Sequence, residues 1–404
     1  MAKVRILFVD DDPNILSGLQ RMLRPMRGEW DIACATSGAA ALQMLEMEPA
    51  DIVVSDMRMP GMTGSQLLRD VMKRYPSVVR IALSGQADEE STFSAIGPTH
   101  QYLTKPCDGE TLKQTIRRAC ALRSLLANEA LLKIISRIES LPSLPQQYLE
   151  IERELRSPEP SIQNVGGIVA RDIAMAAKVL QLVNSAFFGL TRHVSSPQMA
   201  TSLLGLETIR ALVLSVHVFS HYQDPGIPGF SLERLWSHSV QVASFAQSIA
   251  RAERAGAEVI NEAMIAGMLH DVGKLILAVN ASDEYSRAVA LEQDQHLLAW
   301  RAETQTFGVT HAEVGAYLLG LWGLPQGIVD AVAHHHHPSG SAGLSFDAVM
   351  AVHAADAIQS EACPGHSPGE GQLDEEHLAR VGLLQRVPVW RTACQAAKRA
   401  GSDQ

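Results

Sequence analysis

The first 110 residues alternate short apolar, β-branched stretches with longer segments in which apolar residues recur every three or four positions. The short stretches predict strands at residues 4–9, 30–35, 51–55, 79–83 and 101–104. The segments between and after them predict helices near residues 13–25, 37–48, 64–74, 88–96 and 108–126. This alternation is typical of an α/β fold built on a doubly wound, five-stranded parallel sheet.

A second pattern begins where the strands end. From Leu112 to Ile138 apolar residues keep a helical period without an obvious break, which predicts one long helix that leaves the α/β region. Pro142 and Pro145 interrupt this helix, and the following two hundred residues are helical with almost no alternation of period two. We therefore expect an α/β domain at 1–122, a connecting helix at 123–140, an all-helical domain at 141–360, and a loop with closing helices at 361–404.

The composition limits the functional classes. A chain of 404 residues with 46% apolar and 19% charged residues is typical of a globular protein with two or three domains. It has no run of about 18 apolar residues and no signal-peptide pattern, so we expect no membrane span and a cytoplasmic location. The five cysteines show no close pairing pattern, which is expected for a protein in a reducing compartment. The net charge of −10 argues against broad nucleic-acid binding.

Polar side chains follow the ends of four predicted strands. Asp10 and Asp11 follow the first strand, Asp56 the third, Ser84 the fourth and Lys105 the fifth. Because parallel strands deliver their carboxyl ends to one edge of a sheet, these groups should meet there. The three carboxylates suit Mg²⁺, Lys105 supplies a positive charge, and Ser84 can donate a hydroxyl hydrogen bond to a phosphoryl group. Any single acid could instead be a strand-end or helix-capping residue.

Asp12 is the strand-end acid for which capping is the better interpretation. It stands directly before Pro13, and proline is favoured in the first turn of a helix. We therefore predict that Asp12 caps the first helix and is not a metal ligand.

The helical half carries a series of histidine and aspartate residues, which are His238, His270, Asp271, His311, a run at 334–337, and Asp356. Imidazole and carboxylate groups are ligands for Fe, Mn or Zn, and the adjacent pair His270-Asp271 can supply two ligands to one centre or bridge two. Each member also has a simpler interpretation. His238 could be a core histidine, His270-Asp271 a helix-end pair, and the run a solvated helix terminus.

The α/β region resembles the receiver domain of two-component response regulators, whose sheet is flavodoxin-like. The resemblance implies that Asp56 accepts a phosphoryl group from a histidine kinase, with Lys105 and Ser84 assisting. It also implies that Ser84 and Tyr102 switch on phosphorylation. Mg²⁺ would be held by Asp10, Asp11, Asp56 and the backbone carbonyl of Arg58.

The helical region resembles the HDOD family, which is related to the HD phosphohydrolases. The resemblance rests on LPSLP (141–145), KVLQLVNSAFFG (178–189), ATSLLGL (200–206), LWSH (235–238), AGMLHDVGK (266–274) and HAEVGA (311–316). It implies an all-helical, regulatory or scaffolding output. The order of the histidines and aspartates also resembles the metal set of the HD phosphohydrolases, parts of which many HDOD members lack, and this resemblance implies the ligands His238, His270, Asp271, His311, His335, His336 and Asp356. The chain departs from the cyclic-di-nucleotide phosphodiesterases of this superfamily. It lacks their Gly-Tyr-Pro motif, and His337 stands where they have an acid.

These resemblances lead to two functional hypotheses. The first is a response regulator of a two-component phosphorelay, in which phosphorylated Asp56 controls an HDOD domain that signals through contacts with an unidentified protein. The second is a receiver-gated, metal-dependent phosphodiesterase acting on a cyclic dinucleotide or another phosphoester. Neither hypothesis involves nucleic acid or a membrane as partner, and a homodimer is expected by resemblance only.

Overall fold

The computed structural model describes residues 3–402 except 76, 86–100, 106–108, 127, 138–145, 156, 158, 184–193, 223, 323, 342–344 and 362–370. The helix predicted near 88–96 and the segments 141–145 and 184–189 therefore lie outside the described residues. The chain divides into two compact units. Residues 1–136 with 319–324 form the α/β unit, and residues 137–318 with 325–404 form the helical unit.

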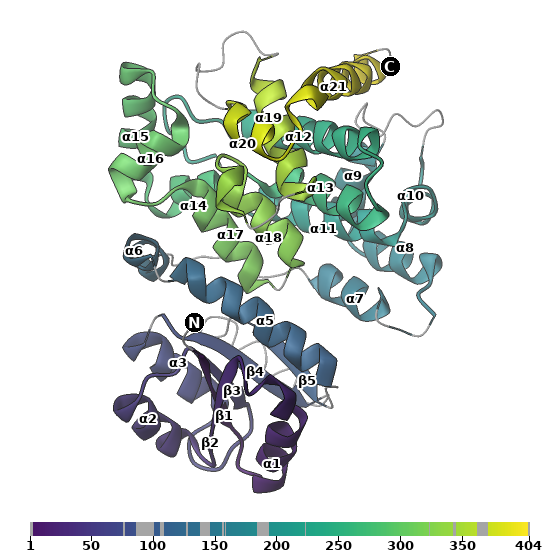
Figure 1. Ribbon diagram of the computed structural model, residues 1–404. Helices are drawn as coiled ribbons and strands as arrows, with labels where there is room; N and C mark the ends of the chain where they lie inside the picture. Colours follow the sequence, from purple (N-terminus) through teal and green to yellow (C-terminus); the bar gives the residue numbers. More distant parts are fainter. Residues whose placement is uncertain are drawn as a thin grey trace. The chain divides into compact units, whose positions relative to one another are not determined.

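The α/β unit is built on five parallel strands, as predicted. The strands are β1 (Val4–Val9), β2 (Trp30–Ala35), β3 (Ile52–Asp56), β4 (Val79–Gly85) and β5 (Gln101–Lys105), in the order β2-β1-β3-β4-β5. The helices are α1 (Pro13–Met22), η1 (Arg24–Met26), α2 (Gly38–Met47), α3 (Gly64–Arg74) and α5 (Gly109–Leu126). In Figure 1, α2 and α3 lie on one side of the sheet and α1 and α5 on the other. This is the flavodoxin-like doubly wound order.

The central strands are apolar throughout because helices cover both faces of the sheet. The side chains of Ile6 to Val9 and of Ile52 to Val54 are at most 2% exposed. The first polar residues after β1 and the last residue of β3 stand at the carboxyl edge of the sheet. Asp12 caps α1 by accepting the N–H of Asn14, as predicted.

Gly64 places the start of α3 directly against the end of β3. A Cβ atom at this position would lie 2.0 Å from the carbonyl oxygen of Asp56, so only glycine permits the approach. The N–H of Gly64 donates to the carbonyl of Met57, and Thr63 and Gln66 form a capping box. The backbone that carries Asp56 is thus fixed from both sides.

The prediction of one continuous helix through 112–138 is wrong. The helix α5 ends at Leu126, and a second helix, α6, runs over Glu129–Arg137. Between them the Asn128 side chain accepts the N–H groups of Ala130 and Leu131, so it acts as an N-cap that starts a new helix. The apolar period continues across this break, and the period alone therefore did not reveal it.

The helical unit contains no strand among its described residues, as predicted. Its helices are α7 (Gln146–Leu155), α8 (Ile162–Ala170), α9 (Ile173–Val183), α10 (Pro197–Leu204), α11 (Leu206–His221), α12 (Leu232–Ala252), α13 (Ala257–Leu269), α14 (Val272–Asn280), α15 (Ser282–Gln295), α16 (Ala299–Phe307), α17 (His311–Leu321), α18 (Gln326–His334), η2 (Pro338–Gly340), α19 (Ala348–Glu361), α20 (Glu375–Arg380), η3 (Leu384–Arg386) and α21 (Val387–Ser402). The long α12 packs against α13, α19 and α21. Among the described residues no helix is both long enough and apolar enough to cross a membrane.

The closing helices are anchored to the end of α12 by one partly buried carboxylate. Glu253 accepts hydrogen bonds from Arg386 Nε at 2.8 Å and from Trp390 Nε1 at 2.7 Å. The Trp390 side chain is fully buried. The helix α21 therefore contributes Trp390 to the core of the helical unit.

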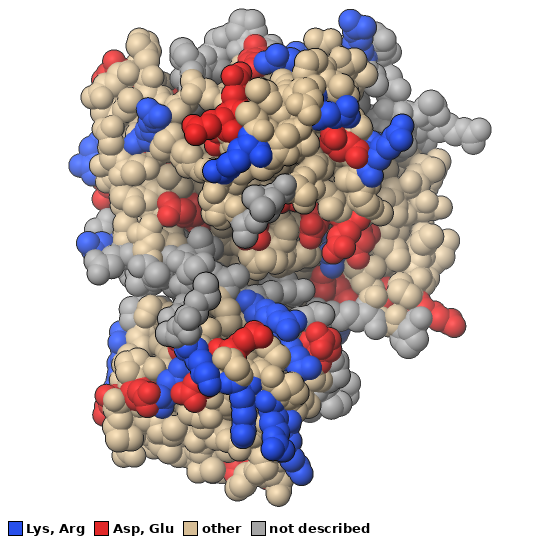
Figure 2. All heavy atoms as spheres, in the orientation of Figure 1, with Lys and Arg blue, Asp and Glu red and all other residues tan. Residues whose placement is uncertain are grey.

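The surface of the α/β unit is locally basic, although the whole chain carries a net charge of −10. Figure 2 shows Lys and Arg side chains gathered on the visible face of this unit. Arg21, Arg24 and Arg27 are exposed within a short stretch at the end of α1 and in η1. The negative charge of the chain is thus unevenly distributed.

Candidate functional site

The structure brings the three acids of the α/β unit together. Asp10 directly follows β1 and is 2% exposed, Asp11 is exposed, and Asp56 is the last residue of β3. One carboxylate oxygen of each residue lies within 4.8 Å of the others. Oxygen-only donors at this separation are what Mg²⁺ requires.

Lys105 joins this cluster from the last residue of β5. Its Nζ lies 2.7 Å from Asp10 Oδ2 and 2.7 Å from Asp56 Oδ1. Burial alone would lower the pKa of the Lys105 ammonium, but the hydrogen bonds and charges of Asp10 and Asp56 outweigh burial and raise it. Three carboxylates face one ammonium, so the cluster keeps an excess negative charge that a divalent cation would offset.

The other predicted residues of this site are only partly described. Arg58 lies two residues after Asp56 in the loop before α3, and its side chain is exposed. Ser84 pairs with Thr104 in the sheet, and Ala82 pairs with Tyr102. The strands thus place Ser84 and Tyr102 on β4 and β5, while their side chains lie outside the described part of the chain.

The histidine and aspartate residues of the helical unit form one buried cluster, although they come from distant parts of the sequence. His238 lies on α12, His270 and Asp271 between α13 and α14, His311 at the start of α17, His335 and His336 after α18, and Asp356 on α19. All seven side chains are at most 7% exposed. The turn at 270–273 can approach α17 because Gly273 has no side chain. A Cβ atom at this position would lie 1.9 Å from the carbonyl oxygen of His311, which is too close for any other residue.

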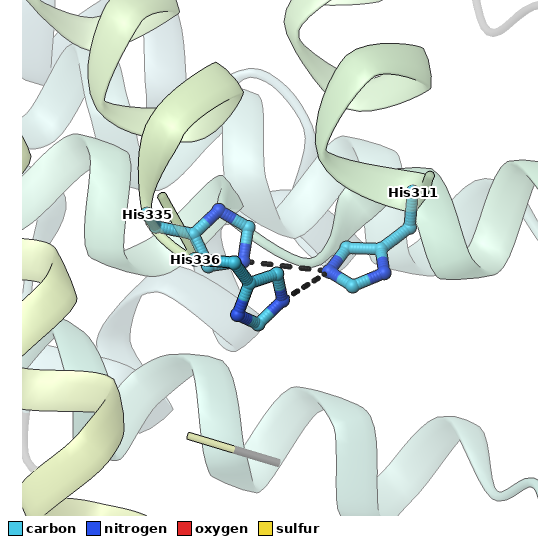
Figure 3. Close-up of side chains that lie close together, drawn as sticks. All are labelled: His311, His335 and His336. Atoms are coloured by element: carbon cyan, nitrogen blue, oxygen red, sulfur yellow. Dashed lines mark hydrogen bonds between the residues drawn. The ribbon is translucent and has the colours of Figure 1, made fainter. Parts of the chain in front are cut away.

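Within this cluster three imidazoles form one group. His336 Nε2 lies 3.0 Å from His311 Nε2, and His335 Nε2 lies 3.4 Å from the same atom. Figure 3 shows the rings of His335 and His336 turned toward His311 from a separate helix. Three imidazole nitrogens at this spacing can hold one metal ion.

A second group is made by His238, His270 and Asp356. His238 Nε2 lies 3.1 Å from His270 Nε2 and 3.3 Å from Asp356 Oδ1. Their donor atoms also fall within 4.8 Å of one another. The seven residues thus supply two separate donor groups, and a third group of His270, Asp271 and His335 overlaps both.

Asp271 has one oxygen beside each group. Its Oδ1 lies 3.1 Å from His311 Nε2, whereas its Oδ2 lies 3.4 Å from His270 Nε2 and 2.8 Å from Lys274 Nζ. Oδ1 is buried and makes no well-directed hydrogen bond among the described residues. A buried carboxylate oxygen without such a bond is costly, and a metal ion would satisfy it.

The outer nitrogens of four imidazoles fix the direction of the inner ones. Each Nδ1 atom lies within 3 Å of an oxygen atom. The Nδ1 atoms of His270 and His335 face the backbone carbonyls of Gly267 and Val332, that of His238 faces Gln359 Oε1, and that of His311 faces Glu303 Oε2. A carbonyl or carboxylate oxygen can only accept, so Nδ1 carries the proton and Nε2 presents a lone pair. Lone pairs that face one another at these distances repel each other, and a cation between them would remove this repulsion.

Three of the five cluster histidines have pKa values that agree with neutral imidazoles, whereas the effect of burial on His238 is outweighed by Asp356 and Asp271, which raise its pKa. Burial holds the pKa of His270 below its usual value, and those of His335 and His336 well below it. Burial acts the same way on His311, but the charge of Glu303 and the 3.1 Å contact with the Asp271 carboxylate outweigh it and raise the pKa of His311 to about 9. A proton on His311 therefore takes the place of a cation in the metal-free cluster, and metal binding would release it.

Glu303 is a functional residue that the sequence did not reveal. It lies on α16, is 2% exposed, and its Oε2 accepts both His311 Nδ1 at 2.6 Å and the His311 backbone N–H at 2.8 Å. A single glutamate in a helical pattern is usually exposed, and only the packing of α16 buries this one. His353, which the sequence left as an ordinary residue, donates from Nδ1 to the carbonyl of His335 and accepts the N–H of Asp374.

Glu303 provides a test of the metal cluster that leaves every direct donor in place. We expect Glu303→Gln to lower metal affinity by roughly 10- to 100-fold, because the amide keeps the size of the side chain but loses the charge that polarises His311. Competition with a chromophoric chelator measures this affinity. Glu313→Gln, on the first turn of α17, serves as the matched control. Equal affinities of Glu303→Gln and the control would show that Glu303 only packs.

Two family models match the chain. The model of the response regulator receiver domain matches residues 6–117, and the model of the HDOD domain matches residues 141–338. Asp356 and Gln359 lie beyond the second match.

Known proteins resemble different parts of the chain. A crystal structure of an HDOD domain protein of unknown function from Geobacter sulfurreducens superposes with a TM-score of 0.55 and 26% identity, covering 67% of this chain and 93% of that one. The heme response regulator HssR of Staphylococcus aureus is 34% identical over 151 residues, 37% of this chain and 63% of its own length. An uncharacterized protein of Treponema pallidum is 26% identical over 204 residues, 50% of this chain and 39% of its own. The chain thus spans less than two thirds of these curated relatives.

Proposed function

Because this chain belongs to the response regulators that join a receiver domain to an HDOD domain, we propose that phosphoryl transfer to Asp56 controls the helical unit, which signals through contacts with another protein. A histidine kinase is the phosphodonor that a receiver domain implies. The observation that carries this proposal is the pair of 2.7 Å contacts that hold Lys105 between Asp10 and Asp56.

The acid cluster supports phosphoryl transfer at Asp56. Asp10, Asp11 and Asp56 would hold Mg²⁺, which offsets the negative charge of an incoming phosphoryl group. The Asp56 carboxylate is the nucleophile, and Lys105 stays beside it to neutralise the acyl phosphate that forms. The family pattern assigns Ser84 and Tyr102 to the conformational response on β4 and β5. New charge-assisted bonds at this edge can shift a two-state equilibrium by a few kcal/mol.

The buried cluster of the helical unit fits bound divalent metal. Among the described residues, the buried charged groups of this cluster are the carboxylates of Glu303, Asp271 and Asp356 and the ammonium of Lys274. Their charges sum to −2 when the imidazoles are neutral. His311, His335 and His336 would hold one ion, His238, His270 and Asp356 a second, and Asp271 would serve both. Imidazole with carboxylate suits Fe, Mn or Zn. Such ions can polarise a phosphoester or its attacking water when substrate has access.

Burial of the ligand set favours signalling over hydrolysis. The seven side chains are at most 7% exposed, so bound ions would chiefly cross-link α12, α17, α18, α19 and the turn between α13 and α14. The Gly-Tyr-Pro motif of the related phosphodiesterases is replaced by His337-Pro338-Ser339-Gly340, which forms a turn of 3-10 helix at 338–340. A rigid metal-bound helical unit suits a docking module.

The completeness of the ligand set favours one second candidate, the receiver-gated phosphodiesterase. The two candidates are separated by assaying the full chain for hydrolysis of cyclic-di-GMP and bis(p-nitrophenyl) phosphate, with and without the acyl-phosphate mimic beryllofluoride. We expect metal to be bound, no turnover in either state, and altered amide hydrogen exchange in the helical unit when beryllofluoride is added. Turnover that is lost in His270→Ala/Asp271→Ala would instead establish the phosphodiesterase.

A further inference from the structure

A cavity of about 880 Å³ lies in the helical unit between α9, α11, α12 and α21. Its volume falls within the range of roughly 300–1,000 Å³ that is usual for small-molecule sites. It shares α12 with the metal cluster, because Trp236 and Ser237 line the cavity while the adjacent His238 belongs to the cluster. We infer that this cavity binds a small anionic molecule with a planar heteroaromatic ring, of the size of a mononucleotide.

The aromatic wall of the cavity is fixed before a ligand arrives. The rings of Trp236 and Phe219 meet edge to face, with centroids 4.7 Å apart and an interplanar angle of 63°. Phe219 is buried in a small apolar cluster with Leu235 and Leu275, whereas Trp236 is only partly buried. An indole held in this way offers a flat apolar surface on which a heteroaromatic ring can stack.

Two ammonium groups line the same cavity. Lys178 on α9 donates from Nζ to Ser220 Oγ at 2.7 Å, and Lys398 lies on α21. Within the part of the chain that the structure describes, neither lysine forms an ion pair with a carboxylate. Ammonium groups whose charge is not offset attract an anionic substituent such as a phosphate.

The lining also contains two acids, so the formal charges of its two lysines and two acids sum to zero, but neither acid is paired with either lysine among the described residues. Asp224 accepts the N–H groups of Gly226 at 2.9 Å and Leu232 at 3.0 Å, and these hydrogen bonds commit its carboxylate to the loop before α12. Glu233 stands in the first turn of α12, where the positive end of the helix dipole favours a carboxylate. Glu233 thus belongs to the amino-terminal end of α12, and Asp224 to the loop that precedes it.

The remaining polar groups of the lining can form hydrogen bonds with the edge of a heteroaromatic ring. Gln181 and Gln241 each offer an amide, and Ser237 and Ser244 each offer a hydroxyl. Amides both donate and accept, as the edges of nucleobases do. A cavity with an aromatic wall, amide edges and two ammonium groups therefore matches a nucleotide better than an acyl chain or a simple anion.

Binding of AMP and GMP to the full chain tests this inference, with adenosine and guanosine as uncharged probes. Calorimetry should give saturable binding of at least one mononucleotide, with the matching nucleoside at least roughly tenfold weaker because it lacks the charge that Lys178 and Lys398 attract. Lys178→Gln should weaken nucleotide binding about tenfold and leave nucleoside binding unchanged, and Lys178→Arg should restore it. Trp236→Leu should weaken both probes.

Two further variants complete the experiment. Lys73→Gln, an exposed lysine on α3, is the matched control and should bind as the unmodified chain does. His270→Ala/Asp271→Ala should retain nucleotide binding, which separates this cavity from the metal cluster. The inference is overturned by lack of saturable mononucleotide binding at millimolar concentration, or by binding that survives both Lys178→Gln and Trp236→Leu. Loss of binding in a double variant that circular dichroism shows to be folded would likewise overturn it by assigning the nucleotide to the metal cluster.

Discussion

Asp56→Asn is expected to abolish phosphorylation of the chain by acetyl phosphate in the presence of Mg²⁺. The substitution removes the nucleophilic oxygen and one donor of the acid cluster, and it leaves Lys105 paired with Asp10 alone. Because an amide cannot form the acyl phosphate, the expected loss is complete. Phosphate-affinity electrophoresis of the full chain measures the phosphorylated fraction directly.

Asp12→Asn is the matched control for this prediction. Asp12 lies close to the cluster in the sequence, but its side chain accepts the N–H of Asn14 and caps α1. Asparagine caps helices as well as aspartate does, so this variant should be phosphorylated like the unmodified chain. Phosphorylation of Asp56→Asn at an undiminished level would place the phosphoacceptor elsewhere.

Asp271→Asn is expected to remove metal from the helical unit and to lower its thermal stability. Asp271 stands between the two donor groups, so the amide weakens both positions at once. The substitution also leaves the ammonium of Lys274, 8% exposed, without its 2.8 Å carboxylate partner. Breaking a buried ion pair from one side costs about 3–5 kcal/mol.

The metal contribution can be separated from the loss of the ion pair. Metal present at about a thousand times its dissociation constant stabilises a folded protein by about 4 kcal/mol. A chelator should therefore lower the melting temperature of the unmodified chain and leave that of Asp271→Asn unchanged. Asp294→Asn, an exposed residue of α15, should respond to chelation as the unmodified chain does. A metal role for the cluster would be contradicted if the chelator changed neither the melting temperature nor the metal content of the unmodified chain.

The sequence predicted the elements whose burial follows from local pattern. The strands β1 and β3 are continuous apolar runs because they are covered on both faces, and Asp12 precedes a proline that starts a helix. Asn128 shows where pattern fails. The residue breaks a helix through two hydrogen bonds of its side chain, and the apolar period around it does not change.

In the candidate sites, too, some features could be predicted from the sequence and others depend on tertiary contacts. The chemistry of histidine and aspartate made the candidate metal ligands recognisable in the sequence, and the family resemblance selected His335 and His336 from the run at 334–337. Their division into two groups, with Asp271 facing both, depends on contacts between helices far apart in the chain. Glu303 and His353 could not be distinguished from exposed or ordinary residues, because their roles come from partners eight and eighteen residues away.

The scattered origin of the buried cluster has a consequence for biosynthesis. Its donors begin at His238 and end at Asp356, so the set is complete only after the ribosome has made most of the chain. The sheet of the α/β unit is complete at Lys105, and domains generally fold as units in the order of their synthesis. A nascent chain can therefore carry a folded α/β unit while the histidines of the second unit are still exposed. Under the metal-binding proposal, an ion can enter the complete donor set only after translation has passed Asp356, and a translational pause before that residue would lengthen the period in which the histidines are exposed to other ions.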